Sequence, residues 1–372
     1  MLSYALMANK KNVLLLYITE RSGHHSAALA IKSALLLKDP DCDCLCVNAF
    51  KYVFPIAERV IHLIYLSVIK RVPVVWESMY DNQKLFAKSE NIKNWVHNIA
   101  VKKIKRLLDG FMPDVIVCTQ AFPCGIVADF KKINLSKIPL IAVLTDFTPH
   151  SFWVYDEIDH YIVPCDKSRD LLIEKGVPKQ KILPFGIPID PKFAQNPDKR
   201  ELFANFGLQP DIPVIMIMGG GHGLGPIKDI INELENADRK LQLIVVCGMN
   251  IKLYNWINKT SFKNRVLNYK FTDQIDRLMS ISSLIITKPG GVTTAEALAK
   301  KLPIVISNPI PGQESRNTQI LVSNKAAVLL ESPKQALSEV SLILESGQDL
   351  QVDPSFSKPK SSIQIAELIL KI

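Results

Sequence analysis

The sequence of 372 residues has no long, uncharged apolar run. A transmembrane helix needs roughly 18 to 20 consecutive and mostly apolar residues. The most apolar stretch, residues 53–76, is interrupted by four charged residues, Lys70 and Arg71 among them. Residues 1–12 also lack the apolar core and small-residue cleavage site of a secretory signal peptide. We therefore predict a protein that faces the cytosol, with neither a signal peptide nor a transmembrane helix.

Repeats, low-complexity tracts and the cysteine spacing of metal sites are also missing. No sequence period of about 20–50 residues recurs, which argues against solenoid and propeller folds. Hydrophobic residues make up 48% of the chain and charged residues 22%, as in globular proteins. The seven cysteines form no C-x-x-C pair, and Cys42, Cys44 and Cys46 have the spacing of one strand face. We interpret them as reduced thiols and expect no metal site.

Short, continuously apolar runs alternate with helical patterns along the chain. Four runs lie in the first half, at 13–19, 115–119, 140–144 and 161–163, and four in the second, at 214–218, 243–247, 284–287 and 304–307. Uninterrupted apolar strands separated by helices indicate parallel sheets covered on both faces. The pattern occurs twice, and the length suits two domains. We predict an α/β protein with two doubly wound, Rossmann-like domains whose strand ends face a shared cleft.

Proline and glycine are densest between residues 183 and 197, which is typical of a linker. We place the domain boundary there, with an N-terminal domain over 1–188 and a C-terminal domain over 189–354. The tail, 355–372, contains a short amphipathic helix that could pack against either half.

The net charge of +9 is unevenly distributed. Residues 51–110 contain eleven Lys or Arg and five Asp or Glu, which gives 11 − 5 = +6. The same segment holds an apolar run at 60–69 and several aromatic residues, including Trp76. Cations beside apolar side chains suit the surface of an anionic membrane. An ordinary pair of helices with a solvated basic face fits equally well. No nucleic-acid-binding motif accompanies the charge, so we expect no nucleic-acid partner.

Two motifs in the first half could supply a general base. His24 lies in the turn Arg21–Ala28 after the first apolar run, where a helix begins and backbone N–H groups are available. A histidine there can accept a proton near neutral pH, or it can simply cap the helix. Asp146 follows another strand and is the second choice. Trp153, near it, is a possible platform for an acceptor, although both residues could equally be structural.

Three glycine-containing or polar turns in the second half point to a phosphate- and sugar-binding site. Gly219–Gly221 begin a loop with five glycines after the run 214–218, but the loop matches neither a dinucleotide-binding fingerprint nor a P-loop. It suits phosphate oxygens, or merely a sharp bend. The next turn offers Gly290, Gly291, Thr293 and Thr294, and Glu296 could accept ribose hydroxyls or cap its helix. Finally, Gln313, Glu314 and Asn317 could recognise sugar hydroxyls, or form a solvated loop.

Taken together and in this order, five motifs resemble those of monogalactosyldiacylglycerol synthases and bacterial processive diacylglycerol glucosyltransferases of glycosyltransferase family 28. The motifs are SGHHSAA, LTDFTPHSFW, GGGHGLGPI, KPGGVTTAEAL and PGQESRN. The chain is more distantly similar to the N-acetylglucosaminyltransferase of the peptidoglycan lipid intermediate. The resemblance covers roughly residues 13–330 and implies a GT-B fold, inversion at the anomeric carbon and no bound metal or other cofactor. One departure is Arg21-Ser22-Gly23, where three glycines are frequent.

The resemblance also implies roles for individual residues. The catalytic residue would be His24, and Asp146 is kept as the second choice because of its own position after a strand. The nucleotide-sugar site would contain Gly219, Gly220, Gly221, Phe271 near the uracil, Lys288, Gly290, Gly291, Thr293, Glu296 on the ribose, Gln313 and Glu314. The acceptor and membrane-facing residues would be Lys70, Arg71, Trp76, His150 and Trp153.

The expected partners are a UDP-sugar, a diacylglycerol-type lipid and an anionic membrane surface, to which the protein would bind peripherally. Three other functions stay open. They are N-acetylglucosaminyl transfer to a polyprenyl-linked lipid, epimerisation of a UDP-sugar by the same fold, and sugar-nucleotide binding without turnover.

Overall fold

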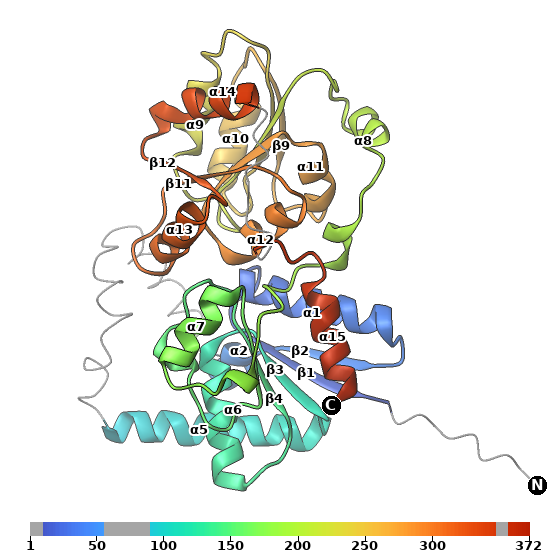
Figure 1. The fold of residues 1–372 in the computed structure, drawn as a ribbon, viewed down its shortest axis with the longest axis vertical. Helices are drawn as coiled ribbons and strands as arrows, with labels where there is room; N and C mark the ends of the chain where they lie inside the picture. The colour runs from blue at the N-terminus through green and yellow to red at the C-terminus, as the bar shows by residue number, and fades with distance from the viewer. Residues whose placement is uncertain (1–9, 56–89, 347–355) are drawn as a thin grey trace, which may run out of the picture. The chain divides into compact units, whose positions relative to one another are not determined.

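A computed structural model describes residues 10–55, 90–346 and 356–372. The chain forms two compact units, coloured from blue to red along the sequence in Figure 1. The first unit contains Met1–Thr145, Pro149–Pro191 and Lys360–Ile372, and the second contains Asp146–Thr148 and Lys192–Pro359.

Six parallel strands form the sheet of the first unit in the described residues, in the order β2-β1-β3-β4-β5-β6. They are β1 (Asn12–Tyr17), β2 (Asp43–Asn48), β3 (Val115–Cys118), β4 (Leu140–Val143), β5 (His160–Ile162) and β6 (Ile182–Leu183). The helices of this unit are α1 (Gly23–Lys38), α2 (Ala49–Val53), α5 (Glu90–Phe111), α6 (Ala121–Asn134), α7 (Asp166–Glu174) and α15 (Ser361–Lys371), with short 3-10 turns η1 (Ser151–Trp153) and η2 (Lys179–Lys181).

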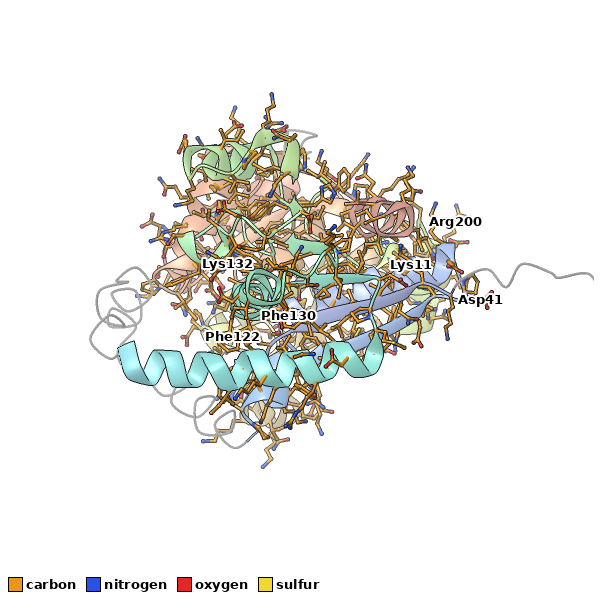
Figure 2. The ribbon with its side chains drawn as sticks, turned by 90° about the horizontal axis from the view of Figure 1, so that it is seen from below. Lys11, Asp41, Phe122, Phe130, Lys132 and Arg200 are labelled. Atoms are coloured by element: carbon orange, nitrogen blue, oxygen red, sulfur yellow. The ribbon has the colours of Figure 1, made fainter. Side chains whose placement is uncertain are left out.

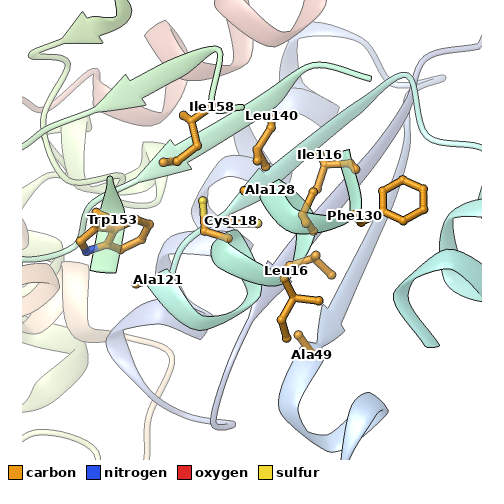
Figure 3. Close-up of a cluster of buried hydrophobic side chains, with 14 of the residues drawn as sticks. Leu16, Ala49, Ile116, Cys118, Ala121, Ala128, Phe130, Leu140, Trp153 and Ile158 are labelled. Carbon is orange, nitrogen blue, oxygen red and sulfur yellow. The ribbon is translucent and has the colours of Figure 1, made fainter. Parts of the chain in front are cut away.

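Alternate side chains of β1 enter two apolar cores, one on each face of the sheet, because successive strand residues point in opposite directions. Leu14 and Leu16 join the core beneath α5 and α6, part of which is shown in Figure 3. Val13 and Leu15 join the core beneath α1 and α15. Helix α15 lies beside α1 (Figure 1) and buries its apolar face there. The C-terminal helix therefore completes the first unit.

Helix α5 covers the opposite face of the same sheet, next to Phe122 and Phe130 of α6 (Figure 2). Its described side chains divide by character: Val101, Ile104 and Leu108 are buried. Lys102, Lys105 and Arg106 are exposed. The apolar face of this part of the basic segment is thus core, and these three cations face solvent. Lys70, Arg71 and Trp76 lie outside the described residues.

The second unit has the same architecture. Among the residues described, its six parallel strands follow the order β12-β11-β10-β7-β8-β9. They are β7 (Val214–Met218), β8 (Gln242–Val246), β9 (Arg265–Tyr269), β10 (Leu284–Thr287), β11 (Ile304–Ser307) and β12 (Val328–Leu330). Its helices are α8 (Lys199–Phe206), α9 (Ile227–Leu234), α10 (Ile251–Lys259), α11 (Ile275–Ile281), α12 (Gly291–Ala299), α13 (Gln313–Ser323) and α14 (Ala336–Ser346), with 3-10 turns η3 (Pro191–Ala194) and η4 (Pro333–Gln335).

These strand orders confirm the predicted fold class of two doubly wound sheets. They also locate one switch point in each unit, where the order reverses: between β1 and β3 in the first sheet and between β7 and β10 in the second. Connections leave the two strands of a switch point toward opposite faces, which opens a crevice at their carboxyl ends. The turns after these four strands are therefore where ligands are expected.

The chain passes from one unit to the other at positions that differ from the expected boundary of 188/189. The passages are at Asp146, Pro149, Lys192 and Lys360. Ile182 and Leu183, at the edge of the presumed linker, form β6 and pair with β5. The chain stays with the first unit as far as Pro191. No helix within the described part of the chain has both the length and the apolarity needed to cross a membrane.

Candidate functional site

His24 occupies the switch point of the first unit. It is the second residue of α1, whose N-terminal cap is Ser22. Its Nδ1 atom lies 3.0 Å from the carbonyl oxygen of Thr119 and 2.8 Å from Thr145 Oγ1. A carbonyl oxygen can only accept a hydrogen bond, so the contact with Thr119 assigns a proton to Nδ1, and in the neutral ring the lone pair is then on Nε2. The ring is thereby oriented as a proton acceptor through Nε2.

The neighbouring His25 is held differently. Its ring stacks on Tyr17, with 4.4 Å between ring centroids, and its Nδ1 accepts a hydrogen bond from the Arg21 backbone N–H at 3.2 Å. Arg21 has a φ of +58°, in the left-handed region that favours glycine. A non-glycine residue there costs roughly 1–2 kcal/mol. Arg21 therefore adopts a backbone conformation that glycine would adopt at no steric cost.

Thr119 and Thr145 are the residues that orient His24, and the sequence pattern predicted this role for neither. Thr119 follows β3 and is fully buried, and its hydroxyl also donates to the His24 carbonyl oxygen at 2.8 Å. Thr145 follows β4 by two residues and is 4% exposed. The available signal was their position after two neighbouring strands, β3 beside β1 and β4 beside β3.

The glycine loop after β7 is packed tightly against itself and against the end of β8. A Cβ atom on Gly219 would lie 2.3 Å from the Leu224 carbonyl oxygen. One on Gly223 would lie 2.1 Å from that of Cys247, and Gly223 also has a φ of +58°. Gly220 has a φ of +66° with open space around it. Glycine at positions 219 and 223 is thus required by the sharp bend of the loop itself, which was one of the two interpretations of the sequence. The carbonyl oxygen of Gly221 accepts a hydrogen bond from the Met249 N–H at 2.9 Å.

The turn after β10 combines a buried cation with a helix start. Lys288 is 7% exposed, and its Nζ lies 2.8 Å from Glu314 Oε1. The other oxygen of Glu314 accepts the Ile310 backbone N–H at 2.8 Å. Gly290 caps α12 with an ordinary φ of −68°. A Cβ atom there would meet nothing within 4 Å. Neither its conformation nor its packing explains why position 290 is a glycine.

Residues of the first turns of α12 and α13 divide into structural and accessible ones. Thr294 is fully buried and its hydroxyl donates back to the Gly290 and Gly291 carbonyl oxygens. Thr293, Glu296 and Gln313 are half-buried. These three side chains therefore retain accessible surface at the carboxyl edge of the second sheet.

Asp146 belongs to the second unit, whereas His24 belongs to the first. Its Oδ1 accepts a hydrogen bond from Asn317 Nδ2 at 3.0 Å, and the same nitrogen donates to the Pro289 carbonyl oxygen at 3.1 Å. Asn317 Oδ1 accepts the Phe147 backbone N–H at 3.0 Å. Asn317 is completely buried, so its side chain connects protein segments and is not exposed to a sugar.

The remaining predicted residues differ in accessibility. Phe271, just beyond β9, is 55% exposed. Trp153 is only 5% exposed and belongs to the core beneath α6 (Figure 3), which gives it a packing role. The half-buried His150 ring lies 6.0 Å from the Trp153 ring, measured between centroids.

Two family models match consecutive parts of the chain. Residues 24–189 match the monogalactosyldiacylglycerol (MGDG) synthase family, and residues 214–367 match the glycosyltransferase family 28 C-terminal domain. The first match begins at His24. The second includes the glycine loop, the turn after β10 and the start of α13.

Similar proteins extend over nearly the whole chain. A processive diacylglycerol beta-glucosyltransferase of Bacillus cytotoxicus is 29% identical over 98% of this chain and 95% of its own length. A protein of the same name from Bacillus cereus is 28% identical over 91% and 87%. Among solved structures, UDP-GlcNAc 2-epimerase from Neisseria meningitidis has a TM-score of 0.61 at 13% identity, covering 97% of this chain and 100% of its own. MurG of Acinetobacter baumannii has a TM-score of 0.58 at 13% identity with the same coverage. The solved structures share the fold.

Proposed function

The chain belongs to the family 28 glycosyltransferases related to the MGDG synthases, and from this premise we propose that it transfers a hexose from a UDP-sugar to 1,2-diacylglycerol. The observation that carries the proposal is the identity of 29%, over almost the full length of both chains, to a protein named as a processive diacylglycerol beta-glucosyltransferase. The two switch points fit this chemistry. One presents a histidine oriented to accept a proton, and the other a glycine turn with a buried lysine.

The proposed reaction is a single displacement with inversion. The acceptor hydroxyl oxygen bonds to the anomeric carbon while the bond from that carbon to the UDP oxygen breaks, and UDP leaves with the electron pair. His24 Nε2 takes the hydroxyl proton. Negative charge grows on the departing diphosphate, so groups already aimed at it contribute most to the rate. Lys288 and the N–H groups at the start of α12 are those groups.

We propose that turnover is metal-independent. In many enzymes that act on diphosphates, a divalent cation neutralises the leaving group. Here the ammonium group of Lys288 and the backbone amides after Gly290 provide positive charge at the turn after β10. Phe271, exposed beyond β9, offers an apolar surface for the base, and Glu296 a carboxylate for the ribose.

We also propose that the first unit binds the cytoplasmic face of an anionic membrane, where the lipid acceptor lies. The exposed residues Lys102, Lys105 and Arg106 of α5 support this, because a basic side chain near an anionic surface contributes about 1 kcal/mol to binding. The wider segment 51–110, with its net charge of +6, provides further cations. Binding is therefore expected to weaken with salt.

The other three functions have less support. The epimerase from Neisseria meningitidis is 13% identical to this chain, and its similarity shows a shared fold. MurG is also 13% identical to this chain, so its similarity likewise shows only a shared fold. The more similar full-length relatives, at 28–29% identity, are named as glucosyltransferases acting on diacylglycerol. The proton-accepting orientation of His24 argues against a purely binding role.

A panel of radiolabelled UDP-sugars with diacylglycerol vesicles tests the proposed function. We expect one UDP-hexose to yield a labelled monoglycosyldiacylglycerol, at the same rate with EDTA as with added magnesium. The same sugar nucleotide without vesicles should remain unchanged. Formation of an isomeric UDP-sugar in the absence of lipid would instead establish an epimerase, and loss of turnover in EDTA would refute the metal-independent mechanism.

Gly290 and Gly219 make a matched pair for testing the phosphate-binding turn. Gly290→Ala adds a methyl group where the protein has open space, so we expect unchanged thermal stability. If a diphosphate approaches this turn closely, the same methyl group should weaken UDP binding about tenfold or more. Gly219→Ala should lower stability, because the new Cβ atom would clash with backbone atoms of Leu224.

Calorimetric titration with UDP gives the UDP affinity of each variant, and a thermal melt gives its stability. Unaltered UDP affinity in Gly290→Ala would show that the ligand stays away from this turn.

A further inference from the structure

Asn317 is a fully buried side chain whose hydrogen bonds all lead to other parts of the protein that lie far away in sequence. It sits on α13, one turn after Gln313 and Glu314. Its amide nitrogen faces two acceptors, Asp146 Oδ1 and the Pro289 carbonyl oxygen, and its amide oxygen faces the Phe147 N–H. These partners determine which amide atom is nitrogen and which is oxygen. Both N–H groups of the amide are in use.

The segment that Asn317 contacts is anchored independently. Phe147 is 2% exposed, and its ring stacks on Phe356 with 5.9 Å between centroids. Burial of this ring fixes the backbone at residue 147. The Asn317 amide accepts the Phe147 N–H through its oxygen and donates through its nitrogen to the carboxylate of Asp146, one residue earlier. The ring therefore holds the segment in place, while the amide sets the direction of the carboxylate.

We propose that Asn317 is a positioning residue that orients Asp146 against the turn after β10, and that it does not recognise the sugar. The hydrogen bond to Pro289 links the same amide to the turn that carries Lys288 and Gly290, so the carboxylate and the donor-binding turn share one support. The proposal rests on the proposed function for its kinetic consequences, but not for the hydrogen bonds themselves.

The variant Asn317→Asp tests the arrangement through charge. It keeps an oxygen for the Phe147 N–H but replaces the donating nitrogen, 3.0 Å from Asp146 Oδ1, with an oxygen. Two carboxylates at this distance cannot both ionise without strong repulsion, so the pair retains a shared proton. The other charged groups on α13 and on the turn after β10 are Lys288, Glu314 and Arg316. Lys288 and Glu314 pair with each other.

The first measurement needs no substrate. Urea unfolding midpoints of the wild type and Asn317→Asp would be compared between about pH 5 and about pH 8. The shared proton raises the pKa of the pair in the folded state. The variant's stability is therefore retained at low pH and lost, relative to the wild type, as pH rises. The control Gln319→Glu adds a carboxylate to the exposed side of α13. The difference between its urea midpoint and that of the wild type should not change with pH.

The second measurement is kinetic. Displacing a reacting or charge-bearing group by about 1 Å costs up to about 10²-fold in rate. We expect Asn317→Ala to lower kcat by about 10- to 100-fold, with less than about a threefold change in KM for the UDP-sugar. For Asn317→Asp, kcat relative to the wild type should rise as pH falls, because the shared proton restores the contact. The double variant Asp146→Asn with Asn317→Asp should recover stability at high pH but not turnover.

Two results would overturn the proposal. One is a raised KM for the UDP-sugar with unchanged kcat in Asn317→Ala, which would assign sugar recognition to this residue. The other is a pH-independent stability difference for Asn317→Asp. If Asn317→Ala does not fold, the aspartate variant at low pH still provides the comparison. If the wild type transfers no sugar, the proposed function fails, while the urea series still tests the contact.

Discussion

Replacing His24 with alanine should lower kcat about 10²- to 10⁴-fold, because the variant lacks the proposed proton acceptor. UDP affinity should stay within about threefold of the wild type, since the proposed UDP site lies in the second unit and His24 in the first. The assay is transfer from the active UDP-hexose to diacylglycerol vesicles, with UDP binding measured by calorimetry.

The adjacent histidine provides a matched control. His25→Gln removes the other imidazole of the same turn, whose ring stacks on Tyr17 and whose Nδ1 accepts from Arg21. Turnover should fall by no more than about threefold. Near-normal turnover of His24→Ala, or equal losses in the two variants, would show that His24 is not the base.

Glu314→Gln should destabilise the protein, and UDP should restore more stability to this variant than to the wild type. The change preserves side-chain size but leaves Lys288, 7% exposed, without its counter-ion. Removing one partner of a buried pair costs about 3–5 kcal/mol, and we expect the lower end because a quarter of the Glu314 side chain (25%) is exposed. If UDP binds at this turn as proposed, its diphosphate supplies the missing negative charge next to Lys288.

The measurement is the rise in melting temperature at a saturating UDP concentration, which reports binding to the folded state. A second lysine pair serves as the control. Lys131 is also 7% exposed, and its Nζ lies 2.6 Å from Asp159 Oδ2, an oxygen that also accepts the Leu140 N–H. Asp159→Asn should destabilise the first unit without enlarging the effect of UDP. Equal UDP effects in the wild type and Glu314→Gln would place Lys288 away from the diphosphate.

Central strands were predictable because they are buried on both faces and consist of uninterrupted apolar residues. The bounds of β7, β10 and β11 coincide with the apolar runs at 214–218, 284–287 and 304–307. β9 was harder to predict. It is an edge strand with the sequence RVLNY, and its side chains are half-buried or exposed, so a strictly apolar criterion misses it. β6 has two residues and adjoins a stretch rich in proline and glycine, which predicted a linker.

The same distinction applies to the site. The placement of His24 and Lys288 at strand ends was predictable because both follow apolar strands, and parallel strands bring their carboxyl ends to one edge. The role of Asn317 could not be predicted, because it depends on hydrogen-bond partners that lie 170 and 171 residues away in the sequence. The sequence pattern grouped Asn317 with Gln313 and Glu314 as a sugar-recognising residue. Local patterns locate turns, but they do not specify which side chains a distant segment will cover.

The repeated passage of the chain between its units limits how this protein can be divided or recombined. A fragment ending at Pro191 would lack α15, so the apolar residues of α1 that pack against Ile365 and Ile369 would meet water. A fragment spanning only 192–359 would lack Phe147, and Phe356 and Asn317 would lose their partners. Chimeras that exchange the second unit between relatives must therefore include the tripeptide Asp146–Thr148 with that unit. Helix α15 must stay with the first unit.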